Sequence, residues 1–257
     1  MRACLATALL SLLLAPAAMA GGRTLTFTYD SSVLPPGSLE IEPWVTARFG
    51  RPDGYTQFDN RLEFELGVVP ALQTSVYLNF STTHEGPRGS NVQSWSLSNE
   101  WKWKLLDPVA DAFGFALYGE VLLGVNEQEL EAKLIFDKRI GPLLLALNII
   151  GEYGWESRPS ETVKEQVLDV TAGGSYALGA GFAVGVEARL NNIWETGEGF
   201  VGGALFVGPV VSYSHRSFWL ALSFLPQVVG YGGTTVGGLS LADQERYNIR
   251  LLAGFSL

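Results

Sequence analysis

A strict alternation of apolar and polar residues over long segments restricts most of this chain to β structure. Between residues 58 and 66, Leu62 and Leu66 fall on one side of an extended chain, while Arg61 and Glu63 fall on the other. An α-helix would mix these two sets of residues, whereas a strand separates them because its side chains alternate between two faces. The segment is therefore predicted to be a strand with one apolar and one charged face.

The same two-residue period recurs along the chain and predicts an all-β fold of about twelve strands. Most of the segments are 10–14 residues long, whereas strands of soluble proteins average about 5–6 residues and a tilted strand crosses a bilayer in about 9–11. The length favours an antiparallel transmembrane β-barrel with up-and-down topology, and a soluble periplasmic β-sandwich is the main alternative fold. The predicted strands are residues 38–49, 56–68, 72–82, 92–105, 113–124, 128–138, 142–155, 165–177, 181–191, 201–213, 216–227 and 246–257.

The connections between these strands alternate in length. The odd-numbered links include the longer, polar segments 83–91, 156–164, 192–200 and 228–245, and the even-numbered links include the tight turns 69–71, 139–141, 178–180 and 214–215. The short link 125–127 and the long link 106–112 depart from the pattern. Outer-membrane barrels have short periplasmic turns, longer external loops and an even number of strands. The alternation thus predicts an outer-membrane barrel with both termini in the periplasm of a Gram-negative bacterium.

The first twenty residues have the form of a secretory signal peptide. Arg2 precedes an apolar stretch over residues 5–14, and Ala18 and Ala20 form a small-x-small cleavage pattern. Residues 1–20 are therefore assigned to the signal, residues 21–37 to a periplasmic N-terminal segment and residues 38–257 to the barrel. Cys4, the one cysteine of the chain, leaves with the signal, which excludes disulfides, cysteine-based metal sites and a cysteine nucleophile in the mature protein.

Two interpretations stay open for the N-terminal segment. Residues 24–29 alternate threonine with Leu25, Phe27 and Tyr29, and a Pro-Pro-Gly turn follows at residues 35–37. The segment is either a free periplasmic lead or a short plug that enters the barrel, and the sequence does not separate these arrangements.

The final strand carries a continuous apolar face to the last residue. Tyr247, Phe255 and Leu257 belong to that face, and a strand of this kind in water would promote aggregation. It resembles the C-terminal signal that the barrel-assembly machinery reads, with Leu257 where an aromatic residue is more usual.

Four blocks of sequence carry a resemblance to a known family. They are Leu-Pro-Pro-Gly at 34–37 leading into residues 40–46, Leu-Leu-Asp-Pro at 105–108 leading into 114–120, and the segments 129–135 and 148–153. Together they are similar to a family of Gram-negative outer-membrane β-barrel proteins without an assigned biochemical role. The resemblance implies the fold and the location, and it brings no active site with it.

The charged residues of the strands are predicted to face the lumen, since Arg or Lys facing the middle of the bilayer costs about 2–4 kcal/mol. Acids outnumber bases in this set by thirteen to eight. The acids are Glu40, Glu42, Asp59, Glu63, Glu65, Glu100, Glu120, Glu129, Glu131, Asp137, Glu152, Asp169 and Glu187, and the bases are Arg48, Arg61, Lys102, Lys104, Lys133, Arg189, Arg246 and Arg250.

Two interpretations compete for these charges. They form either a paired ladder that fills and stiffens a closed lumen, or the wall of a narrow, water-filled pore that favours cations. The leading hypothesis is a porin-like, non-enzymatic barrel that forms a narrow, cation-biased channel for small solutes. The alternatives are a closed structural or surface-interaction barrel acting through residues 228–245, and, third, a lipid-modifying barrel enzyme.

No catalytic or metal site is predicted, and no cofactor. His84 falls in an external link and His215 in a periplasmic turn, so the hydrocarbon core, about 25 Å thick, would separate them. The excess of acids, 26 Asp and Glu against 17 Lys and Arg, argues against nucleic-acid binding. The expected partners are outer-membrane lipid, lipopolysaccharide and the barrel-assembly machinery, and the expected state is a monomer.

Overall fold

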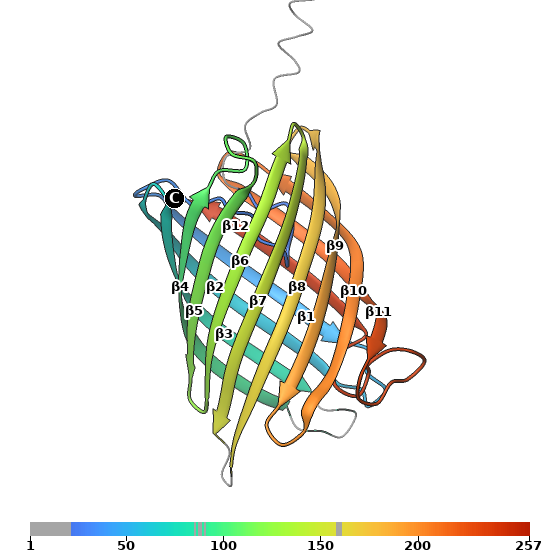
Figure 1. Ribbon diagram of the computed structural model, residues 1–257. Helices are drawn as coiled ribbons and strands as arrows, with labels where there is room; N and C mark the ends of the chain where they lie inside the picture. Colours follow the sequence, from blue (N-terminus) through green and yellow to red (C-terminus); the bar gives the residue numbers. More distant parts are fainter. Residues whose placement is uncertain (1–21, 85, 87–88, 90, 158–160) are drawn as a thin grey trace, which may run out of the picture.

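The computed structural model describes residues 22–84, 86, 89, 91–157 and 161–257, and it confirms the predicted antiparallel barrel of twelve strands (Figure 1). The predicted signal peptide, residues 1–20, lies outside the described residues. The strands are β1 Leu39–Phe49, β2 Thr56–Val69, β3 Leu72–His84, β4 Asn91–Leu106, β5 Gly114–Gly124, β6 Glu127–Ile140, β7 Leu143–Ser157, β8 Thr162–Gly179, β9 Phe182–Glu195, β10 Gly199–Ser214, β11 Phe218–Tyr231 and β12 Tyr247–Ser256.

Each strand pairs with its neighbours in sequence, and β1 closes the barrel by pairing with β12. The closure is continuous to the chain end, since the amide of Leu257 donates to the carbonyl of Leu39 at 3.0 Å. The start of β1 and the end of β12 therefore lie at one end of the barrel, which we call the terminal end (Figure 1). Within the described residues, no helix is long and apolar enough to span a membrane.

The outer face of the wall is apolar. On β7, Leu145, Leu147 and Ile149 expose 46, 40 and 39 % of their surface, while the alternating residues Leu144 and Asn148 are buried inside the barrel. Large exposed apolar side chains recur in the same alternation on the other strands. A continuous apolar surface of this extent is unfavourable in water, and a bilayer provides the medium in which it is stable.

Aromatic pairs lie near the ends of the wall. The rings of Phe182 and Tyr213 are 4.7 Å apart at the terminal end, and those of Trp194 and Phe200 are 5.2 Å apart at the opposite end, whose opening we call the outer mouth. Aromatic girdles of this kind occupy the two interfaces of outer-membrane barrels. Trp219 and Trp44 are exceptions, since Trp219 is only 2 % exposed inside the barrel and Trp44 packs against it.

The connection between β11 and β12 turns back over the outer mouth of the barrel. The side chain of Gln227 accepts a hydrogen bond from the amide of Ser240 at 2.6 Å and donates to the carbonyl of Glu245 at 2.9 Å. Ser240 and Leu241 are buried as a result, at 0 and 7 % exposed. The longest described connection is thus fixed to the wall, and its residues Gln244 and Glu245 line the lumen.

Candidate functional site

The N-terminal segment, residues 22–37, enters the barrel and forms a plug, with Pro35, Pro36 and Gly37 exposed where it leaves the lumen, and this decides between the two arrangements that the sequence left open (Figure 1). Leu25 and Phe27 are 2 and 5 % exposed. Leu25 packs in a cluster with the wall residues Leu144, Ala146 and Val210, and Phe27 packs with Ala204, Phe206 and Leu225. Alternation within the plug therefore has the same cause as alternation in a strand, because its apolar side chains are buried against the wall.

A single carboxylate on β9 holds the middle of the plug. Glu187 is 0 % exposed, and its Oε1 accepts hydrogen bonds from the backbone amides of Thr26, Phe27 and Thr28 at 3.0, 2.9 and 2.9 Å. Its Oε2 accepts from the amide and the hydroxyl of Thr26 at 2.9 and 2.7 Å. Converging backbone amides form an anion-binding concavity. Here the wall supplies the carboxylate of Glu187, and the plug supplies the backbone amides that surround it.

Neutral side chains fix the return path of the plug. Asn148 on β7 accepts from the amide of Tyr29 at 2.6 Å and donates to its carbonyl at 2.9 Å. The amide of Leu34 donates to Gln73 on β3 at 2.9 Å. The plug consequently crosses the lumen from the β9 side of the wall to β7 and then to β3.

Charged contacts supplement these hydrogen bonds. Asp30 pairs with Arg139 at 2.8 Å, and the amide of Ser31 donates to Asp137 at 3.2 Å. Burial acts to raise the pKa of Asp30, but Lys102 and Arg139 outweigh it, so this pKa lies below its ordinary value. Asp30 thus holds its charge beside Arg139.

The aromatic rings of the plug are bracketed by cations from the wall. The guanidinium of Arg250 lies 3.7 Å from the ring centre of Phe27, and the ammonium of Lys133 lies 4.3 Å from that of Tyr29 and 3.9 Å from that of Tyr118. Cation–π contacts stabilise more strongly when the partners are desolvated. Interior bases such as Lys133 and Arg250 therefore also hold the aromatic rings of the plug, in addition to any pairing with acids.

Gly173 makes room for the plug. A Cβ atom at this position would lie 2.8 Å from Cδ1 of Leu25, which is closer than carbon atoms pack. Gly173 therefore leaves the space in the wall that the side chain of Leu25 occupies.

Beyond the plug, toward the outer mouth, the lumen contains a cavity of about 330 Å³. Phe27 and Tyr29 of the plug form its floor, and Gln244 and Glu245 of the β11–β12 connection lie at its rim. Charges of opposite sign line its opposite walls. Arg48, Arg61 and Arg250 come from β1, β2 and β12, whereas Glu129, Glu152 and Glu165 come from β6, β7 and β8.

This separation of charge has a geometric cause. In a closed ring of twelve strands β1 stands opposite β7, so the two groups face each other across the lumen. Ion pairs within the wall neutralise several of these charges. Arg48 pairs with Asp59 at 2.9 Å and Arg61 with Glu120 at 3.3 Å. Among the described residues, Arg250 on one side and Glu129, Glu152 and Glu165 on the other have no ion pair, so the glutamate side carries the excess charge of the cavity.

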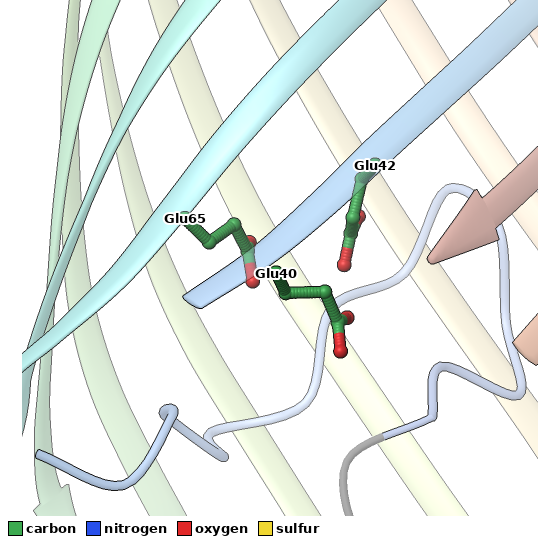
Figure 2. A group of neighbouring side chains, drawn as sticks. All are labelled: Glu40, Glu42 and Glu65. Carbon is green, nitrogen blue, oxygen red and sulfur yellow. The ribbon is translucent and has the colours of Figure 1, made fainter. Parts of the chain in front are cut away.

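A second concentration of charge lies nearer the terminal end and consists of acids. We call Glu40, Glu42, Glu63, Glu65 and Glu100 the acidic cluster. Glu40 lies opposite Glu65 and Glu42 opposite Glu63 in the pairing of β1 with β2. Figure 2 shows Glu40, Glu42 and Glu65 side by side on these two strands, with the N-terminal segment passing near them.

Most of the charged residues expected to face the lumen are buried or half-buried inside the barrel. The buried ones are Glu40, Glu42, Glu63, Glu100, Lys102, Glu120, Lys133, Asp137, Asp169 and Glu187, and the half-buried ones are Arg48, Asp59, Arg61, Glu65, Lys104, Glu129, Glu131, Glu152, Arg189 and Arg250. Arg246 precedes β12 and is exposed. His84 ends β3 and His215 lies between β10 and β11, so the structure does not bring the two histidines together.

Sequence reasoning missed the neutral residues that hold the plug. Asn148, Gln73 and Ser223 contact it directly, with Ser223 at 2.6 Å from the hydroxyl of Thr26. Each has the parity of an interior position, and this was the only sequence signal that could have marked it. A search restricted to charged residues passes over such positions.

Comparisons with known proteins agree with this architecture. A comparison with curated proteins finds no match. The COG4313 outer membrane channel from Pseudomonas putida F1 is similar over 89 % of this chain and 98 % of its own, with 10 % identity and a TM-score of 0.62. The NanC porin is similar over 85 % of this chain and 100 % of its own, with 11 % identity and a TM-score of 0.54.

The beta domain of the Bordetella autotransporter BrkA is also similar, over 86 % of this chain and 100 % of its own, with 14 % identity and a TM-score of 0.52. At these identities the likeness concerns the fold, which is that of outer-membrane barrels. A family model matches residues 17–257, and the chain therefore belongs to the family of unknown function DUF6662.

Proposed function

We propose that this protein is an outer-membrane channel for small solutes, with a preference for cations, and that the N-terminal segment closes it in the conformation described here. The observation that carries the proposal is the construction of the plug. The lumen is filled at the terminal end by a peptide held through hydrogen bonds and ring contacts, principally to Glu187 and Asn148. Contacts of this kind can be released without unfolding a strand.

The cavity supports a transport role. Its polar lining and opposed charges resemble a path for hydrated solutes more than a packed core, because a closed structural barrel has no need of a charged cavity of about 330 Å³. The opposed charges would orient a dipolar solute as it enters. Two of the proteins with a similar structure are a channel and a porin, which adds support by analogy.

The excess of interior acids supports the preference for cations, since thirteen acids and seven bases of the set assigned to the lumen lie on interior strand positions. A charged wall raises the local concentration of counter-ions. In this arrangement the barrel spans the outer membrane with its termini in the periplasm, and its plug enters from the periplasmic side.

The preference is tested by the reversal potential in planar bilayers across a KCl gradient. Replacing Glu129, Glu152 and Glu165 by Gln is expected to shift the reversal potential toward the anion side, because it removes the acidic wall of the cavity. Arg48→Gln is expected to shift it in the opposite direction, since it leaves Asp59, its ion-pair partner at 2.9 Å, uncompensated.

Salt provides an internal control for this measurement. The preference should weaken as the salt concentration rises, because the Debye length falls from about 10 Å at 0.1 M to about 3 Å at 1 M.

Shifts of the same sign in both variants would contradict the assignment of the two walls. Absence of conductance from correctly folded protein, with the plug contacts weakened, would leave the closed structural barrel as the better explanation.

A further inference from the structure

We propose that the acidic cluster binds one calcium ion. The first argument is geometric. Carboxylate oxygens of Glu63, Glu65 and Glu100 lie within 4.8 Å of one another, and so do those of Glu40, Glu42 and Glu65. Two oxygens that share one Ca²⁺ at about 2.4 Å can be at most about 4.8 Å apart, so either set can share an ion, and Glu65 belongs to both.

The negative charge of the cluster is not neutralised by contact. Glu42 and Glu100 are 3 and 1 % exposed, and each has one carboxylate oxygen without a hydrogen-bond partner. Among the described residues, no ion pair joins a base to any of the five acids. Arg23, Arg61, Lys102 and Lys133 interact with the cluster at longer range. Buried acids in this state are costly unless a cation or protons accompany them.

A separate observation points to a missing ligand. The hydroxyl of Ser75 is buried, with the residue 1 % exposed, and it has no hydrogen-bond partner. In the strand pairing Ser75 lies between Glu65 and Glu100, with its side chain on the same interior face. Buried hydroxyls nearly always have a partner, and an ion held by these two acids would supply one.

The donor set favours calcium over other cations. Carboxylate and hydroxyl oxygens are hard ligands, which suit Ca²⁺ and Mg²⁺ rather than transition metals. Mg²⁺ requires near-octahedral geometry at about 2.0–2.1 Å and retains several waters. A group of several carboxylates whose oxygens are up to 4.8 Å apart does not match these requirements. Ca²⁺ accepts irregular sets of six to eight oxygens. Protons shared between the carboxyl groups are the competing explanation, and the experiment distinguishes them.

The test is calcium binding to the mature, folded protein in detergent, measured by titration calorimetry with CaCl₂ at pH 7. Saturable binding of one ion is expected for the wild type. Glu65→Gln, which removes the ligand common to both sets, should weaken binding about tenfold or more. The matched control is Glu152→Gln, another interior acid outside the cluster, which should bind as the wild type does.

Terbium luminescence reports the location of the ion. The indole nitrogen of Trp219 donates to Glu40 at 2.7 Å, so excitation of tryptophan should sensitise Tb³⁺ bound in the cluster, and CaCl₂ should displace it. Ser75→Ala provides a second, milder variant with the carboxylates intact, and it should weaken binding several-fold. Each variant is first shown to fold by heat-modifiable migration on a gel.

Absence of saturable binding between pH 6 and 8 would show that protons alone neutralise the cluster, and would overturn the proposal. Equal binding by the wild type and Glu65→Gln would place the ion elsewhere and would overturn it too. The proposal does not depend on transport, because a permanently closed barrel would bind the ion equally well.

Discussion

Glu187→Gln is expected to raise the open probability of the barrel in planar bilayers about a hundredfold. The substitution keeps the size of the side chain but removes the charge of the carboxylate, which accepts hydrogen bonds from the backbone amides of Thr26, Phe27 and Thr28. Hydrogen bonds to charged groups contribute about 1.5–3 kcal/mol each. A loss of about 3 kcal/mol in docking the plug corresponds to about a hundredfold larger undocked population.

The matched control for this variant is Glu152→Gln, which also neutralises an interior acid but has no hydrogen bond to the plug among the described residues. Its open probability should remain near that of the wild type. If the two variants conduct alike, Glu187 does not control the plug. If neither variant differs from a closed wild type, the lumen has a further barrier besides residues 22–37.

Leu78→Arg is expected to lower the stability of the folded barrel in lipid by about 2–4 kcal/mol, the cost of Arg at the middle of the bilayer. Leu78 is at the centre of β3, exposes 47 % of its surface and is paired with Leu62 and Leu97 on the same outer face. The measurement is the midpoint of unfolding in urea, followed by heat-modifiable migration in lipid vesicles.

Leu78→Ala is the control, since it removes apolar surface without adding charge, and it should cost much less than the arginine variant. A similar cost for both substitutions would mean that the outer face contacts water rather than lipid. In detergent-free buffer the comparison is uninformative, because the apolar wall then has no medium in which to remain soluble.

Much of this architecture followed from sequence because it depends on local alternation. Side chains on a strand alternate with a period of two, and a bilayer requires one apolar face throughout, so segments such as 58–66 could be oriented residue by residue. The predicted strand boundaries differ from the observed ones by a few residues. For example, β8 begins at Thr162 and ends at Gly179, and it extends beyond the predicted range 165–177 because hairpins continue past the apolar belt.

Alternation along a strand assigns each residue to the interior or the outer face, but it does not reveal which partner an interior side chain contacts. Alternation along β11 places Trp219 on the interior face, and only the tertiary structure shows that its indole donates to Glu40 there. Neutral residues that hold the plug, such as Asn148, were overlooked for a related reason. Amide side chains occur on many surfaces, and their role is evident only when the residue to which they hydrogen-bond is known.

The sequence by itself determined the class of fold, the number of strands, the connections and the face on which charges lie, since all of these follow from the two-residue period and the spacing of turns. Only the tertiary structure decided that residues 22–37 fill the lumen, because that depends on contacts such as Thr26 with Glu187, which are 161 residues apart. It also decided which charges meet. Register and barrel closure bring Glu40 beside Glu65 and set Arg48 opposite Glu152, and neither closure nor register is encoded in any local segment.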